Sequence, residues 1–162
     1  MNKQKAIIVD IDGTISDYSK RKHWLEPLNG GNREREVHGA TGVNWDKFNS
    51  EAIHDAPIEE VIKIVRWAKN ASNTKIILLT GRNDKYRRTT LDWLNLHRIP
   101  HDRLLMRKYG DWRADVEVKT ELFLKNIEPA YEVLFALEDR DKVVEMWRNL
   151  GIRCLQVAKG EY

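Results

Sequence analysis

The chain has 162 residues, which is enough for one domain with a substantial hydrophobic core. A hydrophobic fraction of 41% argues against a disordered chain, and a net charge of +3 does not by itself predict a polyanionic partner. The single cysteine, Cys154, excludes an internal disulfide, is typical of a reducing compartment and lies in an apolar run that predicts a buried thiol. The polar amino terminus leads into a hydrophobic run too short for a signal peptide or a membrane span, so we expect a cytoplasmic protein.

Five short hydrophobic runs predict the strands of a buried sheet. In chain order they are residues 6–9, 76–79, 104–106, 133–137 and 154–157. Helical patterns separate them, at residues 58–68, 86–96, 116–127 and 141–150. This alternation predicts an α/β fold in which a mostly parallel central sheet lies between two layers of helices. Ligands of such sheets bind at the carboxyl ends of the strands.

Residues 18–55 interrupt the alternation of strands and helices. The segment is rich in charge, and its glycines are Gly30, Gly31, Gly39 and Gly42. It has little hydrophobic periodicity outside Trp45, Phe48 and Ile53. Irregular segments of this length inside a compact domain usually form functional loops or lids. We therefore expect a single domain over residues 1–162, with residues 18–55 as a small cap or flap.

Two aspartates, Asp10 and Asp12, come directly after the first predicted strand, in the sequence Asp10-Ile11-Asp12-Gly13-Thr14. Carboxylates this close repel each other unless a cation lies between them, and Mg²⁺ suits a site that also holds phosphate. Asp10 is then a candidate nucleophile toward phosphorus, and Asp12 a candidate acid that protonates the leaving oxygen and later activates water. Gly13 lets the backbone pass close to the phosphate. The alternative is a loop that caps a helix or binds a structural calcium ion.

Two further patterns offer groups that suit a phosphate. Thr80, Gly81 and Arg82 follow the second predicted strand, where a hydroxyl, two amides and a guanidinium can contact phosphoryl oxygens. The same three residues are also typical of a helix start. Asp115 and Lys119 are four residues apart on a predicted helix. Lys119 would neutralise charge on the nucleophile and the phosphoryl group while Asp115 holds it, although an ordinary surface ion pair is the alternative.

A second acidic pair, Glu138 and Asp139, follows the fourth predicted strand. These acids would complete the metal shell from across the sheet. The alternative is an acidic helix start that the helix dipole stabilises. All four patterns follow or flank successive elements of one parallel sheet, so we expect them to meet at one rim.

In these residues the chain resembles the haloacid dehalogenase superfamily. Asp10–Thr14, Thr80, Lys119 and the pair Glu138-Asp139 match its four motifs in order, and the likeness covers the chain outside residues 18–55. The resemblance implies a Rossmann-like three-layer fold, Mg²⁺ as cofactor and the two aspartate roles given above. The metal ligands it implies are Asp10, Asp12, Glu138 and Asp139.

The carboxyl half is also similar to the 3′-phosphatase domain of phage polynucleotide kinase-phosphatases. The similar stretches are Thr80-Gly81-Arg82, Gly110-Asp111 with Arg113, Asp115–Lys119, Glu138-Asp139-Arg140, Val143–Arg148 and Gln156-Val157-Ala158. The likeness implies that Arg21 and Arg82 bind the substrate phosphate and that Asp115 supports Lys119. No Gly-x-x-x-x-Gly-Lys-Ser/Thr sequence occurs, so we expect no ATP-dependent kinase activity.

The leading functional hypothesis is a magnesium-dependent phosphatase acting on the 3′-phosphates of polynucleotides. Residues 82–115 contain nine Lys or Arg and five acids, and basic residues contact nucleic-acid phosphates. Trp24, Trp45 and Trp112 are candidates for stacking on bases, whereas Trp67, Trp93 and Trp147 are expected in the core. The alternatives are a 5′- or 3′-nucleotidase or small-ester phosphatase with residues 18–55 as a lid, and a nucleic-acid-binding module without turnover.

Overall fold

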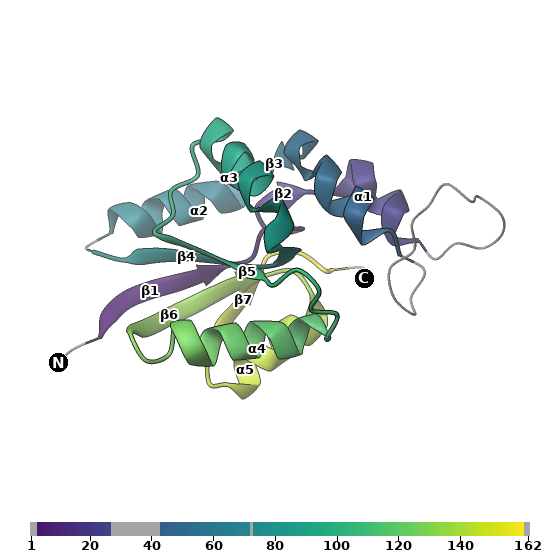
Figure 1. The fold of residues 1–162 in the computed structure, drawn as a ribbon. Helices are drawn as coiled ribbons and strands as arrows, with labels where there is room; N and C mark the ends of the chain where they lie inside the picture. The colour runs from purple at the N-terminus through teal and green to yellow at the C-terminus, as the bar shows by residue number, and fades with distance from the viewer. Residues whose placement is uncertain (1–2, 27–42, 72, 161–162) are drawn as a thin grey trace.

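The central sheet has five parallel strands in the order β5-β4-β1-β6-β7 (Figure 1). The computed structural model describes residues 3–26, 43–71 and 73–160. The strands are β1 (Gln4–Val9), β4 (Lys75–Asn83), β5 (Arg103–Arg107), β6 (Tyr131–Glu138) and β7 (Cys154–Gln156). The predicted α/β fold with a mostly parallel sheet is confirmed.

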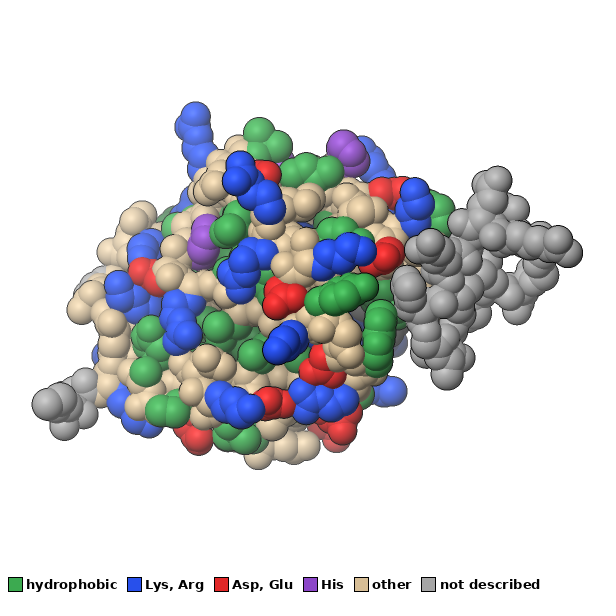
Figure 2. Space-filling view, in the orientation of Figure 1, with side chains coloured by type: hydrophobic (Ala, Val, Ile, Leu, Met, Phe, Trp, Pro, Cys, Tyr) green, Lys and Arg blue, Asp and Glu red, His purple; other side chains and the backbone are tan. Residues whose placement is uncertain are grey.

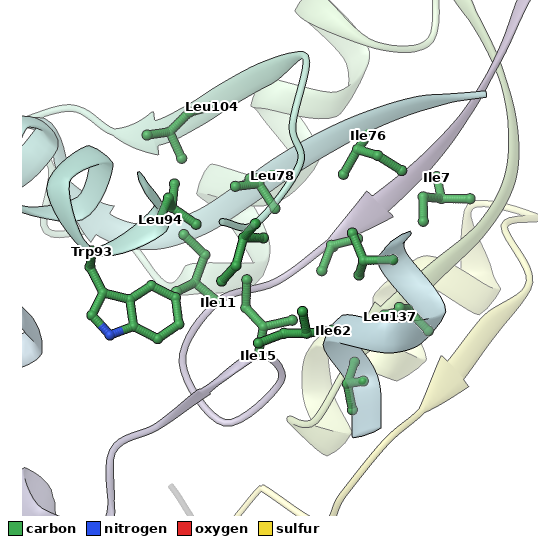
Figure 3. Packing of buried hydrophobic residues seen from close by; sticks show 14 of the residues in the cluster. Ile7, Ile11, Ile15, Ile62, Ile76, Leu78, Trp93, Leu94, Leu104 and Leu137 are labelled. Atoms are coloured by element: carbon green, nitrogen blue, oxygen red, sulfur yellow. The ribbon is translucent and has the colours of Figure 1, made fainter. Parts of the chain in front are cut away.

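Helices cover both faces of the sheet (Figure 1). One layer contains α2 (Glu59–Asn70) and α3 (Arg87–Leu96), and the other contains α4 (Asp115–Asn126) and α5 (Asp141–Asn149). Strand side chains alternate between the two layers. Ile7 and Val9 pack toward α2 and α3, while Ala6 and Ile8 pack toward α4 and α5. Figure 3 shows the first core, in which Ile7 and other residues of the sheet pack with Ile62 of α2.

A bulge interrupts the pairing of β6 with β1. Ala6 pairs with Val133, but the next residue, Ile7, pairs with Phe135, which leaves Leu134 as an extra residue. Val133 therefore packs in the core beside α4 and α5, and Phe135 packs in the core beside α2 and α3. Beyond the bulge the alternation turns Glu138, the last residue of β6, toward the α4 layer.

The described parts of residues 18–55 form short helices beside a small second sheet. These helices are η1 (Ser19–Leu25), α1 (Trp45–Ser50) and η2 (Glu51–His54), and the second sheet pairs β2 (Ser16–Asp17) with β3 (Ala56–Pro57). Residues 27–42, with the four glycines noted above, lie outside the described residues. The assignment of residues 18–55 as a cap or flap therefore stays a prediction.

The burial of individual side chains tests the predicted core. Trp93, Trp147 and Cys154 are buried, as predicted. The prediction for Trp67 is wrong, because α2 packs on the sheet through a face that contains Ile62 and Val65, and the Trp67 side chain is 69% exposed. Among the described residues, no helix is both long enough and hydrophobic enough to cross a bilayer.

Candidate active site

Side chains from three parts of the fold, the end of β1, the end of β6 and α4, meet at the carboxyl edge of the sheet around Lys119 of α4. The Lys119 Nζ atom lies 2.7 Å from Asp10 Oδ1, 2.8 Å from Glu138 Oε2 and 3.5 Å from Asp115 Oδ2. Asp10 directly follows β1, Glu138 ends β6, and Asp115 begins α4 one turn before the lysine. Thr80 of β4 is fully buried, and the Thr14 hydroxyl lies 3.4 Å from the second Asp10 oxygen. The structure thus brings the predicted nucleophile and the predicted lysine into direct contact.

The Lys119 ammonium group is buried among three carboxylates, with 1% of its side chain exposed. Burial alone would lower the pKa of Lys119, but the charges of Asp10, Asp115 and Glu138 raise it well above its ordinary value. The lysine therefore stays protonated and presents a fixed positive charge to the Asp10 carboxylate.

Asp10, Glu138 and Asp139 form a cluster of three buried acids, whose nearest oxygen atoms all lie within 4.8 Å of one another. Burial, reinforced by the charge of neighbouring acids, raises the pKa of Asp10 and of Glu138 and brings the pKa of Asp139 to about 7. Within the described residues, Asp139 Oδ1 is buried and has no hydrogen-bond partner. Buried acceptors are normally satisfied, so the three oxygens fit a hard divalent cation such as Mg²⁺.

Gly13 fits the acid cluster because it has no side chain. Its φ angle is +84°, which glycine adopts without steric cost. A Cβ atom at this position would collide with the Asp139 carboxylate and would lie 3.0 Å from the Tyr18 ring. The turn after β1 can therefore pass directly over the acids only with glycine in this place.

The Asp12 carboxylate lies with two arginines, outside the three-acid cluster. Arg82 Nη2 lies 2.7 Å from Asp12 Oδ1, Arg82 Nε lies 2.9 Å from Asp12 Oδ2, and Arg21 Nη2 makes a close ion pair with Asp12 Oδ1. Burial alone would raise the pKa of Asp12, but Arg82 and Arg21 lower it below its ordinary value. The structure therefore separates the Asp12 side chain from the acids that sequence analysis grouped with it as metal ligands.

A bulge in β4 positions Arg82. Thr80 and Asn83 pair with adjacent residues of β5, so Gly81 and Arg82 lie between them, outside the strand pairing. The Arg82 amide donates to the Thr80 hydroxyl at 3.2 Å, which stabilises the turn. A Cβ atom on Gly81 would lie 2.5 Å from Asp115 Oδ1. Glycine thus allows Asp115 to approach this strand and reach Lys119.

Arg21 is held by the segment that interrupts the fold. It belongs to η1, and its side chain is 2% exposed. Its Nη1 atom donates to the Phe48 carbonyl of α1 at 2.9 Å, and its guanidinium lies 3.9 Å from the centre of the Phe48 ring. The described ends of residues 18–55 therefore place one arginine against the motif that follows β1.

Asp55 is a site residue that sequence analysis missed. Its carboxylate accepts bonds from Arg21 Nε at 2.8 Å and Arg21 Nη2 at 2.5 Å, and a short bond from the Ser16 hydroxyl. It also lies 3.7 Å from Arg82 Nη2, and its side chain is 2% exposed. Asp12, Asp55, Arg21 and Arg82 thus form a buried group of two acids and two arginines. The signal that could have indicated Asp55 is charge balance, because two buried arginines need two acids.

The fold is of the haloacid dehalogenase type. The structure resembles the haloacid dehalogenase-like protein SP0104 from Streptococcus pneumoniae, with a TM-score of 0.64 over 93% of this chain and 83% of that chain, at 12% identity. It also resembles the putative HAD-hydrolase YfnB from Bacillus subtilis, with a TM-score of 0.64 over 96% of this chain and 87% of that chain, at 10% identity. At these identities the two likenesses show the fold.

The sequence assigns the chain to one particular family among the proteins with this fold. Residues 4–162 match the family described as the phosphatase domain of the polynucleotide kinase PNKP, and the chain belongs to that family. It is 35% identical to a chain in the structure of the Pnkp1/Rnl/Hen1 complex, with a TM-score of 0.76 over 99% of this chain and 48% of that one. A second structure, of the Pnkp1/Rnl/Hen1 RNA repair complex, gives 36% identity and a TM-score of 0.77 over 99% of this chain and 44% of that one.

The chain also matches part of a larger viral protein. The putative bifunctional polynucleotide kinase/RNA ligase of Autographa californica nuclear polyhedrosis virus is 25% identical over 149 residues, which are 91% of this chain and 18% of that protein. The chain thus spans less than half the length of these three relatives. The resemblance to the phosphatase domains of polynucleotide kinase-phosphatases is confirmed.

Proposed function

We propose that this chain is a magnesium-dependent phosphomonoesterase that removes 3′-phosphates from polynucleotides through a phosphorylated Asp10. The observation that carries the proposal is the contact of 2.7 Å between Asp10 and the buried Lys119, beside the acids Glu138 and Asp139. Membership of a phosphatase-domain family supports the reaction class. The polynucleotide substrate is supported by the names of the relatives and by the basic stretch of residues 82–115.

In the first half of the proposed reaction, an Asp10 oxygen attacks phosphorus and the ester P–O bond breaks. Asp12 gives its proton to the leaving oxygen. Lys119 stabilises the charge that gathers on the phosphoryl group and the attacking carboxylate. Asp10, Glu138 and Asp139 would hold Mg²⁺, which would supply positive charge to phosphoryl oxygens that the carboxylates would otherwise repel.

In the second half, Asp12 takes a proton from a water molecule that attacks the phosphorus, and the bond between phosphorus and Asp10 breaks. Arg21 and Arg82, which pair with Asp12, have the geometry to bind phosphate oxygens instead. If a bound phosphate draws the two guanidinium groups away from Asp12, the pKa of Asp12 rises. Asp12 can then hold the proton that the first half of the reaction requires.

A substrate panel tests the proposal. The substrates are an oligonucleotide phosphorylated at its 3′ end, one phosphorylated at its 5′ end, the corresponding mononucleotides and p-nitrophenyl phosphate, each with Mg²⁺ and with EDTA. We expect phosphate release from the 3′-phosphorylated oligonucleotide to be fastest and to stop in EDTA. Turnover of mononucleotides alone would exclude the polynucleotide substrate and favour a nucleotidase. Binding of the oligonucleotide without turnover of any ester would favour the binding module.

Asp55→Asn tests the group of two acids and two arginines. We expect kcat/KM to fall by about 10- to 100-fold, mainly through a higher KM, because Arg21 loses the charged acceptor that fixes its guanidinium. Steady-state phosphate release measures the change, and thermal unfolding confirms that the variant is folded. Asp92→Asn removes a surface partner of Arg88 on α3 and is the matched control, with wild-type kinetics expected. Wild-type KM in Asp55→Asn would show that Arg21 needs no such support.

A further inference from the structure

The loop between β5 and α4 presents two aromatic side chains to solvent. In this β5–α4 loop, residues 108–113, Tyr109 is 57% exposed and Trp112 is 58% exposed. Both line a hollow of about 590 Å³, together with Lys108 and Arg113. Figure 2 shows hydrophobic and charged side chains interleaved to the right of centre, where Figure 1 draws this loop. Large aromatic residues are mostly buried, so two on one short loop indicate a binding surface.

The other tryptophans that sequence analysis associated with base stacking lie elsewhere. Trp24 Nε1 donates to Glu51 Oε2 at 2.7 Å, and the Trp45 ring packs edge-on against Phe48, with ring centres 5.8 Å apart. The Trp24 ring thus joins η1 to η2, and the Trp45 ring packs within α1. Trp112 is the member of that set whose side chain is mostly exposed.

Arg107 connects the β5–α4 loop to the proposed catalytic motif. Its Nε atom donates to the Gly81 carbonyl at 3.0 Å, and its Nη2 atom lies 3.2 Å from Asp115 Oδ1. Its Nη1 atom donates to the Arg113 carbonyl at 2.6 Å and to the Asp111 carbonyl at 3.1 Å. One side chain therefore holds the loop that carries the exposed rings against the residues beside Arg82 and Lys119.

The loop is ordered by its own contacts before any ligand arrives. The Tyr109 amide donates to Asp84 Oδ1 at 2.8 Å, and the Asp111 amide donates to the Lys108 carbonyl at 3.0 Å. Gly110 supplies the turn with a φ angle of +83°, and Arg113 makes an ion pair of 2.6 Å with Asp111. A surface held in this way loses little conformational entropy when it binds.

We propose that the β5–α4 loop stacks on bases of a single-stranded polynucleotide whose terminal phosphate lies at Asp10. Aromatic faces beside cationic side chains are the features that bind single strands, because every base has a flat face and every linkage a negative phosphate. Lys85 Nζ lies 5.5 Å from the centre of the Tyr109 ring, and Lys108 lines the hollow. This inference rests on the proposed function and specifies how a strand is distinguished from a single nucleotide.

The double variant Tyr109→Ala/Trp112→Ala tests the inference. For a 3′-phosphorylated oligonucleotide we expect KM to rise by about 10-fold or more, because stacking on each base is lost. The KM for a 3′-mononucleotide and for p-nitrophenyl phosphate is expected to stay within about 2-fold of the wild-type value, and the single variant Tyr109→Phe to retain the low KM. Trp67→Ala is the matched control, since that tryptophan is 69% exposed on α2, and wild-type kinetics are expected.

Two outcomes would overturn the stacking proposal. One is an unchanged KM for the oligonucleotide in the double variant, and the other is an equal rise for all three substrates, which would mean that the loop acts on the chemical site. If wild-type protein released no phosphate from any substrate, the proposed function would fail instead. In that case, fluorescence anisotropy tests the loop alone. It measures the affinity of a labelled oligonucleotide for Asp10→Asn protein with and without the loop substitutions. Equal affinities of the two proteins would refute the stacking proposal.

Discussion

Asp10→Asn is expected to reduce phosphate release by about 1000-fold or more, because an amide cannot form the acyl phosphate of the proposed reaction. The substitution keeps the size of the side chain, and the amide oxygen can still accept a bond from Lys119, which lies 2.7 Å from the Asp10 carboxylate. Single-turnover phosphate release from a 3′-phosphorylated oligonucleotide measures the effect. Asp17→Asn, at an exposed position near the same turn, is the control, with the wild-type rate expected.

The Asp10→Asn substitution should remove activity without lowering the free energy of unfolding. Burial and Glu138 raise the pKa of Asp10 above the ordinary value of 3.8 that it regains on unfolding. The folded state therefore holds this proton more tightly, and folding stability falls as pH rises from that ordinary value toward the raised one. A neutral asparagine lacks this loss, so we expect the variant to be at least as stable as the wild type at pH 7. Wild-type turnover in a folded Asp10→Asn protein would refute Asp10 as the nucleophile.

Lys119→Met is expected to lower the free energy of unfolding by about 3–5 kcal/mol, because it leaves buried carboxylates without their shared cation. The lysine Nζ lies 2.7 Å from Asp10 and 2.8 Å from Glu138, and 1% of the lysine side chain is exposed. Urea unfolding in EDTA measures the loss. Lys125→Met on the same helix is the control, since its pair with Glu121 is exposed and about 0.5 kcal/mol or less is expected.

The pH dependence of Lys119→Met provides a further check. Burial already raises the pKa of Asp10, Glu138 and Asp139, and removal of the lysine raises these pKa values further. The acids can become neutral as pH falls, so the destabilisation should be smaller at pH 5 than at pH 8. Excess Mg²⁺ should restore part of the stability at pH 8. A loss that is equal at both pH values would show that the lysine does not neutralise these acids.

Much of the fold was predictable because its strands are hydrophobic runs buried on both faces. The five predicted runs, from residues 6–9 to residues 154–157, coincide with the five strands of the central sheet. The order of the strands was not predictable, because β1 lies between β4 and β6 through contacts that join segments about 70 and 130 residues away. The second sheet has two residues in each strand, too few to show any periodicity.

The site was predictable where motif residues follow strands, and less so where long side chains reach across the fold. The spacing of Asp10 and Asp12 places both at the rim, but it does not indicate that the Asp12 carboxylate pairs with two arginines. Those arginines come from η1 and β4, which are far apart in the sequence. Asp55 stands in an irregular segment without a motif, so only the buried charges that it neutralises reveal it.

The bulge at Leu134 and the length of β6 after it decide which face of the sheet carries the Glu138 side chain. Because the strand faces alternate, one residue more or fewer between Leu134 and Glu138 would turn the Glu138 carboxylate away from Lys119 and toward the opposite helical layer. Point substitutions along this stretch change packing and leave the acid in place. Insertions and deletions there would remove Glu138 from the proposed active site, so evolutionary drift in this strand should proceed by exchange of side chains at constant length.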